Sequence, residues 1–151
     1  MTVWLMFDFI DAMAGQQAGI DAQNREQRLR TIDTHHDGHG LNESIVIRTD
    51  EPDGSGAAHL YEAHIASDAD GWQIARVQFQ KGPRNVEGST PGMTEAAVLA
   101  ILIDRLRGFQ SGPYSCRENA IQLTKLEEVL HWTQARADAR AKRGVLGHNI
   151  K

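Results

Sequence analysis

The sequence predicts an α+β fold in which a small antiparallel β-sheet is followed by a C-terminal antiparallel helical hairpin. Three observations carry this prediction. Segments with strand-like composition and alternation lie between residues 44 and 80. Two apolar patterns with helical spacing follow them. The segment between these two patterns, 108–119, has the glycine, proline and serine residues of a turn, which joins the helices into a hairpin.

The first 40 residues predict a variable N-terminal arm. Residues 1–10 are mostly apolar, but Asp8 interrupts them and no Lys or Arg precedes Arg25, so we expect no secretory signal. Residues 15–40 are polar and weakly helical at best. No later stretch approaches the roughly 20 apolar residues that a bilayer-spanning helix needs. We therefore expect a cytoplasmic protein without a membrane partner.

Residues 41–92 predict the sheet. Segment 44–49 is rich in β-branched residues, and segments 59–66 and 72–80 alternate with a period of two, which is typical of strands with one buried face. Residues 67–71 have the composition of a hairpin loop between the last two strands. The remaining residues, up to residue 92, are too glycine-rich for a further strand. The expected sheet thus has three antiparallel strands.

Residues 93–151 predict the helical hairpin. The first helix covers 94–107 and ends at Gly108, a residue type that commonly terminates helices. The second helix begins at Ser115–Glu118, which have the spacing of a capping box, and ends before Gly144. A short connection between two long helices favours an antiparallel pair.

The composition fits one globular domain with an uneven charge distribution. The chain has 151 residues, of which 40% are hydrophobic and 24% charged, and its formal net charge is −4. Residues 101–151 nevertheless carry nine basic and five acidic side chains. An acidic protein with one basic region favours a small anionic ligand over polymeric nucleic acid as its partner. The single cysteine, Cys116, excludes an intramolecular disulfide and fits a reducing compartment.

The sequence contains no recognisable catalytic motif. It has no Gly-x-Ser-x-Gly elbow, phosphate loop or paired zinc ligands, so we expect neither an enzyme nor a cofactor. Histidines in the cluster His35–His39 could share a cation on one helical turn, but Gly38 breaks such a helix. Glu128 and His131 have the Glu-x-x-His spacing of a di-iron site, which needs a second copy that the sequence lacks. We therefore predict no metal site.

Six segments together resemble a known family. They are Val77-Gln78-Phe79-Gln80-x-Gly82-Pro83, Thr94-Glu95-Ala96, Ile103-Asp104-Arg105-Leu106, Gly108-Phe109-Gln110-x-Gly112-Pro113, Cys116-Arg117-Glu118-Asn119-Ala120 and Thr124-Lys125-Leu126-Glu127-Glu128. Through these segments the chain resembles the phage Thoeris anti-defence sponges, whose helical hairpin is shared with the phage anti-CBASS sponges. The resemblance extends from about His59 to the C-terminus, and the first forty residues have no counterpart.

The resemblance implies a catalytically inert protein that sequesters cyclic nucleotide immune signals and so blocks Thoeris or CBASS defence. It implies glycocyclic ADP-ribose, made by TIR-domain enzymes, as ligand, with cyclic di- and trinucleotides as further ligands of some members. It also implies a phage- or prophage-encoded homo-oligomer, a hexamer, that acts in the host cytoplasm and binds its ligand between subunits. Pairing of hairpins between subunits would supply the core that three strands and two helices lack.

Carried over residue by residue, the implied ligand-binding positions are Phe109, Asn119, Arg136, Arg140 and Arg84. An aromatic ring can stack on a purine, and an amide offers both a donor and an acceptor to a base or ribose. Arg136 and Arg140, four residues apart on one helix, project from one face and can bind phosphate. Each residue also has a structural interpretation, because Phe109 could seal the hairpin end, Asn119 could cap the helix and the arginines could form a solvated stripe.

Two other functions stay open from the residues. A nucleotide-sensing adaptor would use the same pocket to transmit a signal instead of removing it. A metal-dependent phosphodiesterase acting on such signals would use the cluster His35–His39. Recovery of intact ligand after heating, and the effect of chelators, would discriminate between capture and hydrolysis.

Overall fold

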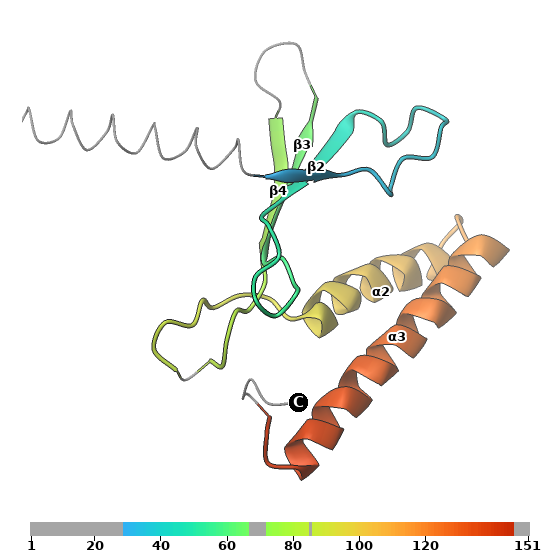
Figure 1. The fold of residues 1–151 in the computed structure, drawn as a ribbon. Helices are drawn as coiled ribbons and strands as arrows, with labels where there is room; N and C mark the ends of the chain where they lie inside the picture. The colour runs from blue at the N-terminus through green and yellow to red at the C-terminus, as the bar shows by residue number, and fades with distance from the viewer. Residues whose placement is uncertain (1–28, 67–71, 85, 147–151) are drawn as a thin grey trace, which may run out of the picture. The chain divides into compact units, whose positions relative to one another are not determined.

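The computed structural model of the protein describes residues 29–66, 72–84 and 86–146 (Figure 1). The chain divides into two compact units, Met1–Arg76 and Val77–Lys151. The elements follow in the order β1 (Arg30–Ile32), β2 (Ile45–Thr49), β3 (Leu60–Ile65), β4 (Trp72–Gln78), α2 (Glu95–Ser111) and α3 (Arg117–Lys142). The predicted α+β class, with the sheet first and the helical hairpin second, is confirmed. The predicted division into 1–40, 41–92 and 93–151 stays a prediction.

The four strands form one sheet in the order β1-β2-β3-β4. β2 pairs antiparallel with both neighbours, so that Thr49 lies opposite Arg30 of β1 and opposite Tyr61 of β3. Thr49 is completely buried, and Leu60 is 9% exposed, which puts the small core of this unit between the ends of β2 and β3. Asp50 fixes the connection between these strands, because its Oδ1 accepts hydrogen bonds from the backbone N–H groups of His59 (2.8 Å) and Leu60 (3.0 Å).

The sheet contains one strand more than predicted. Three strands, β2, β3 and β4, lie in the predicted segments, but β1 lies in the region that the sequence assigned to the N-terminal arm. β1 has three residues, and the first two, Arg30 and Thr31, are exposed. A strand this short shows no alternation, so the hydrophobic pattern could not reveal it. The antiparallel pairing of β1 with β2 identifies it as a strand.

The described residues of the segment 79–93, which are 79–84 and 86–93, form a closed loop between β4 and α2. The N–H of Gln80 donates to Met93 O at 2.9 Å, and Lys81 and Thr90 exchange two backbone hydrogen bonds of 2.9 Å. Gly92 is required here, because a Cβ at this position would lie 2.5 Å from Gln78 O and 2.6 Å from Gln80 N. The described residues of this loop make isolated bridges and no further strand, as its glycine content predicted.

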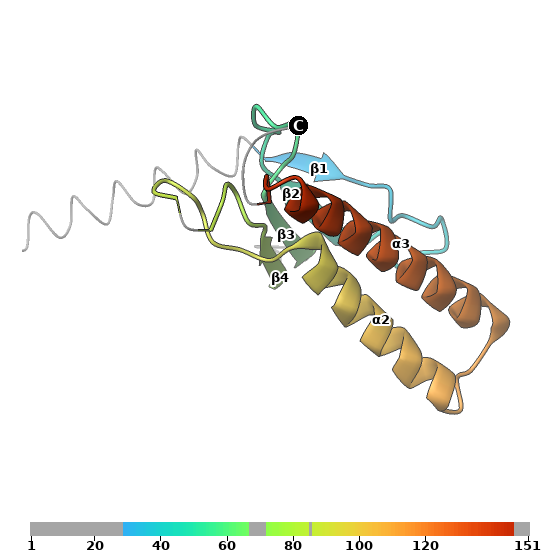
Figure 2. The same cartoon turned by 90° about the horizontal axis from the view of Figure 1, so that it is seen from below.

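Helices α2 and α3 lie side by side and antiparallel in both views (Figures 1 and 2). An ion pair between Arg107 Nη2 of α2 and Glu127 Oε1 of α3, at 2.6 Å, joins the two helices. Among the described residues of the hairpin, Ile103 is the one buried hydrophobic side chain, and α3 contains no buried residue. None of the helices in the described ranges is long and apolar enough to cross a membrane.

The first helix is longer than predicted, because Gly108 does not end it. α2 continues to Ser111, and the backbone N–H of the C-cap Gly112 donates to Phe109 O. One glycine in a helix costs only about 1 kcal/mol relative to alanine, which the flanking helical residues can offset. The start was predicted well, since Thr94 is the N-cap and its Oγ1 accepts the N–H of Ala97 at 3.3 Å.

The second helix starts one residue later than the predicted capping box. Its N-cap is Cys116 and not Ser115, because Cys116 has the extended backbone of a cap and its Sγ accepts the N–H of Asn119 at 3.4 Å. Glu118 then lies in the first helical turn, where its negative charge is favourable to the helix dipole. At the other end, Gly144 has a φ of +69° and stops the helix as predicted.

Candidate functional site

A pocket of about 520 Å³ lies between α2 and α3. Both helices contribute to its wall, and apolar side chains alternate with polar and cationic ones. The lining residues are Leu102, Arg105, Leu106, Phe109, Asn119, Gln122, Lys125 and Leu126. The volume lies within the range of small-molecule sites, which combine apolar walls with a few polar groups that fix orientation.

Phe109 gives this pocket an aromatic surface. The ring is half-buried near the C-terminal end of α2, so part of it stays accessible. The guanidinium of Arg105 lies over the ring, with its central carbon 4.9 Å from the ring centroid. The two residues are four positions apart on α2, which brings their side chains to the same helical face. Phe109 can therefore stack with a base or another flat group.

Asn119 is held in place by the turn that precedes α3. Its backbone N–H donates to Cys116 Sγ, and its side-chain Nδ2 donates to Tyr114 O at 3.3 Å. A carbonyl oxygen only accepts hydrogen bonds, so the amide nitrogen must be the atom that faces Tyr114. Gln110 closes the same turn, because its Oε1 accepts the N–H of Cys116 at 3.0 Å. The Oδ1 of Asn119 is the acceptor that the amide can offer a ligand.

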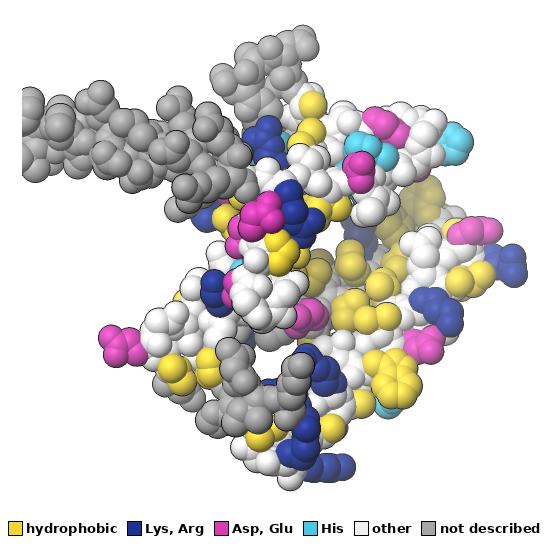
Figure 3. Space-filling view, in the orientation of Figure 1, with side chains coloured by type: hydrophobic (Ala, Val, Ile, Leu, Met, Phe, Trp, Pro, Cys, Tyr) yellow, Lys and Arg dark blue, Asp and Glu magenta, His cyan; other side chains and the backbone are white. Residues whose placement is uncertain are grey.

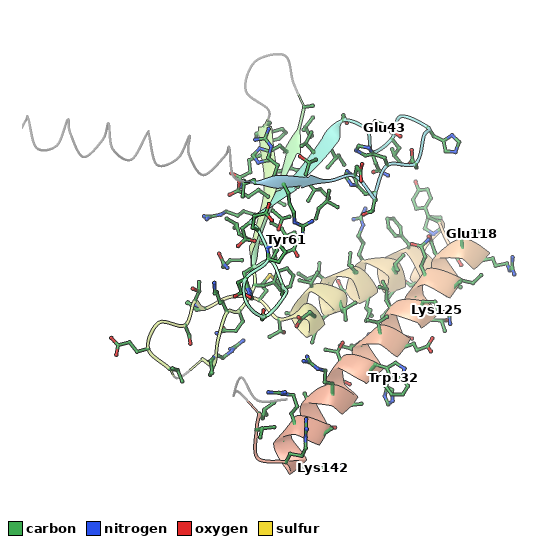
Figure 4. The ribbon with its side chains drawn as sticks, viewed as in Figure 1. Glu43, Tyr61, Glu118, Lys125, Trp132 and Lys142 are labelled. Atoms are coloured by element: carbon green, nitrogen blue, oxygen red, sulfur yellow. The ribbon has the colours of Figure 1, made fainter. Side chains whose placement is uncertain are left out.

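The two arginines predicted on α3 do not share this pocket within one chain. A helix rises about 1.5 Å per residue, so Arg136 and Arg140 lie about 25 and 30 Å further along α3 than Asn119. Figure 4 labels Glu118 and Lys142, which lie close to the two ends of this helix. Arg136 is exposed, whereas Arg140 is half-buried and donates from Nη2 to Val145 O at 3.1 Å.

Arg84 lines a second, smaller pocket of about 300 Å³ in the loop 79–93. Its other lining residues are Gln80, Ser89, Pro91 and Gly92. Gln80 supports this loop from inside, since its side chain accepts the N–H of Gly92 and donates to Gly82 O. The predicted site residues thus occupy three places in one chain. Phe109 and Asn119 line the pocket between the helices, Arg84 lies in the loop 79–93, and Arg136 and Arg140 lie further along α3.

The histidine cluster 35–39 lies in a loop whose polar groups contact one another. His35 Nε2 is 2.8 Å from Ile45 O, and Glu43 accepts hydrogen bonds from the N–H groups of Gly38 and Asn42. Among the described residues, no three His, Cys, Asp or Glu side chains come together in a geometry that could hold a metal ion.

Comparison with known families identifies the segment that forms the pocket. Residues 73–138 match the family model of the Acb2/Tad1 hairpin domain. The resemblance predicted from the sequence is thereby confirmed for this segment. The chain is also 43% identical over 79 residues to Thoeris anti-defense 1 of Bacillus phage SBSphiJ7. That alignment covers 52% of this chain and 55% of the relative, so the chain spans about half the length of the relative it matches.

The match to the Acb2/Tad1 hairpin domain includes the whole wall of the larger pocket, from Leu102 to Leu126. Arg84 and Arg136 also lie inside the matched range, and Arg140 lies two positions beyond it. The pocket of this chain thus lies wholly within the segment that matches the hairpin domain.

Sequence reasoning missed three polar residues of the pocket, namely Arg105, Gln122 and Lys125. The signal for them was present in the helical spacing. Arg105 precedes Phe109 by four residues, and Gln122 follows Asn119 by three, so each shares a helical face with a residue that was predicted. A search for polar side chains on those two faces would have found them.

Proposed function

We propose that this protein sequesters cyclic nucleotide immune signals, with glycocyclic ADP-ribose as the principal ligand, and does not degrade them. Capture would keep the signal from its effector and so block Thoeris defence, and CBASS defence where cyclic di- or trinucleotides also bind. The proposal describes a binding protein without catalysis that acts in the cytoplasm of the infected cell. It requires neither polymeric nucleic acid nor a membrane as partner.

The observation that carries the proposal is the position of the pocket. All of its lining residues fall within the range that matches the Acb2/Tad1 hairpin domain, and the relative with 43% identity is named for action against Thoeris. The pocket also offers suitable chemistry. Phe109 provides a stacking surface worth about 1 to 3 kcal/mol for one base. Asn119 provides an acceptor for a base or ribose donor.

The proposal further assigns phosphate binding to Arg136 and Arg140, and a supporting contact to Arg84. Arg136 and Arg140 lie too far along α3 from Asn119 to reach the pocket of their own chain, so they would contact a ligand only from another copy. We therefore propose that the functional form is a homo-oligomer, with a hexamer as the specific expectation, and that its ligands bind between subunits.

Exposed apolar side chains on the hairpin support assembly. Ile101 and Leu102 of α2 are 59% and 43% exposed, and Trp132 of α3 is 66% exposed. Figure 3 shows hydrophobic side chains at the surface of the hairpin, and Figure 4 shows Trp132 projecting from α3. Burial against a second hairpin would remove this apolar surface from water, which stabilises an assembly by about 25 cal/mol per Å².

Capture without degradation is tested by incubating the full chain with glycocyclic ADP-ribose, removing the protein by filtration and measuring the filtrate by mass spectrometry. We expect the free signal to be depleted and to return unchanged after the protein is boiled. Phe109→Ala should weaken binding at least tenfold, about 1.4 kcal/mol. Tyr114→Ala is the matched control, because Tyr114 lies on the same turn, is 74% exposed and does not line the pocket.

The alternatives give different results in the same experiment. A linearised product in the boiled sample would contradict capture and favour a phosphodiesterase, and loss of that product with EDTA would implicate a metal. An adaptor would bind the signal but would not restore phage growth on a host that carries Thoeris. Expression of a sequestering protein should restore that growth.

A further inference from the structure

Arg105 contributes a cation to the pocket that no prediction had assigned. Its guanidinium lies 4.9 Å from the centroid of the Phe109 ring, and both side chains line the cavity from α2. A cation over an aromatic face is attracted to the ring but keeps its N–H donors at the edge of the contact, available to another acceptor. Among the described residues, no carboxylate forms an ion pair with Arg105.

The charge of the pocket favours an anion. Arg105 on α2 and Lys125 on α3 both line it, and none of the described lining residues is acidic. Lys125 Nζ pairs with Glu128 Oε2 at 2.9 Å, but the two side chains are 71% and 53% exposed. A solvent-exposed pair of this kind contributes little to stability, so a bound phosphate can compete with it.

The position of Arg105 places a cation beside the stacking surface. Its guanidinium lies over the Phe109 ring, so a purine that stacks on this ring would lie close to the cation. A phosphate attached to that purine would be within reach of the guanidinium, whose planar donors can bind two phosphate oxygens at once. Aromatic ring and cation together match a purine attached to a phosphate better than either group alone.

We propose that Arg105 is a phosphate-binding residue of the hairpin pocket and provides a phosphate contact within a single subunit. This inference rests on the proposed function and extends it. Arg136 and Arg140 lie about 25 to 30 Å along α3 from Asn119 and can act only from another copy. Arg105 acts in the same chain as Phe109 and Asn119, so one subunit alone holds both the base and part of the phosphate.

The test compares the binding of glycocyclic ADP-ribose to the full chain and to four variants, one of which is Phe109→Ala, by calorimetry at two salt concentrations. Arg105→Gln should weaken binding at least tenfold and make it less dependent on salt, because a cation that faces the phosphate is lost. Arg105→Lys should recover only part of the affinity, since an ammonium keeps the charge but loses the bidentate geometry. Arg117→Gln is the control, because Arg117 is exposed at the same end of the hairpin and does not line the pocket.

The outcomes separate this inference from the proposed function. If the unaltered protein does not bind the probe, both are wrong. If it binds and Phe109→Ala weakens binding, but Arg105→Gln behaves like Arg117→Gln, only the role of Arg105 is overturned. Thermal melting of each variant identifies any loss of folding, and Arg105→Lys, which keeps length and charge, decides the question if Arg105→Gln unfolds.

Discussion

Arg140 combines a predicted ligand contact with a structural one. Its guanidinium donates to Val145 O, one residue after Gly144 ends α3, and so ties the following chain to the last turn of the helix. Arg136, one turn earlier, is exposed. From the sequence alone the two arginines form an equivalent pair. In the structure they differ, because only one of them supports the end of the helix in this way.

Separate substitution of the two arginines should reveal this difference. Arg136→Gln should weaken binding of glycocyclic ADP-ribose at least tenfold while the melting temperature stays unchanged, since an exposed charge is lost. Arg140→Gln should weaken binding and also lower the free energy of unfolding by about 1 kcal/mol, the usual value of one hydrogen bond. Calorimetric binding and thermal melting measure the two effects. Normal binding by both variants would mean that neither arginine contacts the ligand.

The candidate site could be predicted in part, for identifiable reasons. Phe109 and Asn119 flank the turn between the helices, so any hairpin brings them near each other, and they line one pocket. Arg84 lies in a loop whose closure depends on backbone hydrogen bonds between Lys81 and Thr90, which no residue pattern encodes. Arg105 was missed because its neighbours were interpreted as the apolar face of a helix.

At the scale of the element, two glycines have opposite roles. Gly108 lies inside α2, where a Cβ would meet no other group within 4 Å. Gly92 lies against the backbone of Gln78 and Gln80 in the loop 79–93, where a Cβ has no room. The sequence predicted that Gly108 ends the helix, because a glycine after a helical pattern usually marks its end. Whether a glycine ends a helix depends on the residues that follow it.

Alanine at each glycine tests this assignment. Gly108→Ala should stabilise the protein by up to about 1 kcal/mol, because alanine restricts the unfolded chain and favours the helix. Gly92→Ala should destabilise it, because the new methyl group would overlap the backbone of β4. Chemical denaturation of both variants, monitored by circular dichroism, measures the changes. Destabilisation by Gly108→Ala would indicate that α2 ends at residue 107 after all.

The hydrophobic pattern of the sequence predicted three of the four strands. β2, β3 and β4 have either β-branched centres or alternation, so their positions could be predicted from the sequence. β1 has neither feature, and its position depends on the pairing of Thr31 with Arg48 across the sheet. The start of α3 was misplaced by one residue because a thiol replaced the expected hydroxyl as the cap. Such choices depend on tertiary contacts that a one-dimensional pattern does not contain.

At the scale of the whole molecule, the hairpin leaves large apolar side chains exposed to solvent. A helix of 26 residues without one buried residue gains little from packing within its own chain. Val129 and Trp132, three positions apart on α3, are 48% and 66% exposed. The proposed oligomer accounts for this surface, because a second hairpin would cover it.

The assembly is tested by light scattering. We expect the unaltered protein to have a mass well above that of a dimer, and the double variant Val129→Glu with Trp132→Glu to have a much smaller mass, because two charges would replace the apolar surface. Gln134→Glu, an exposed change on the same helix, should leave the mass unaltered. A monomeric wild-type protein would contradict the oligomer, and an unchanged mass of the double variant would mean that this face lies outside the interface.

The cap of α3 also makes the protein convenient for spectroscopy. Cys116 is the only cysteine in the sequence, and its side chain is exposed. It lies one helical turn before Asn119, which lines the pocket. A thiol-reactive fluorophore would therefore attach at a single position, beside the site and without any engineered cysteine. The fluorescence of such a label on the native chain would report when a ligand binds in the pocket.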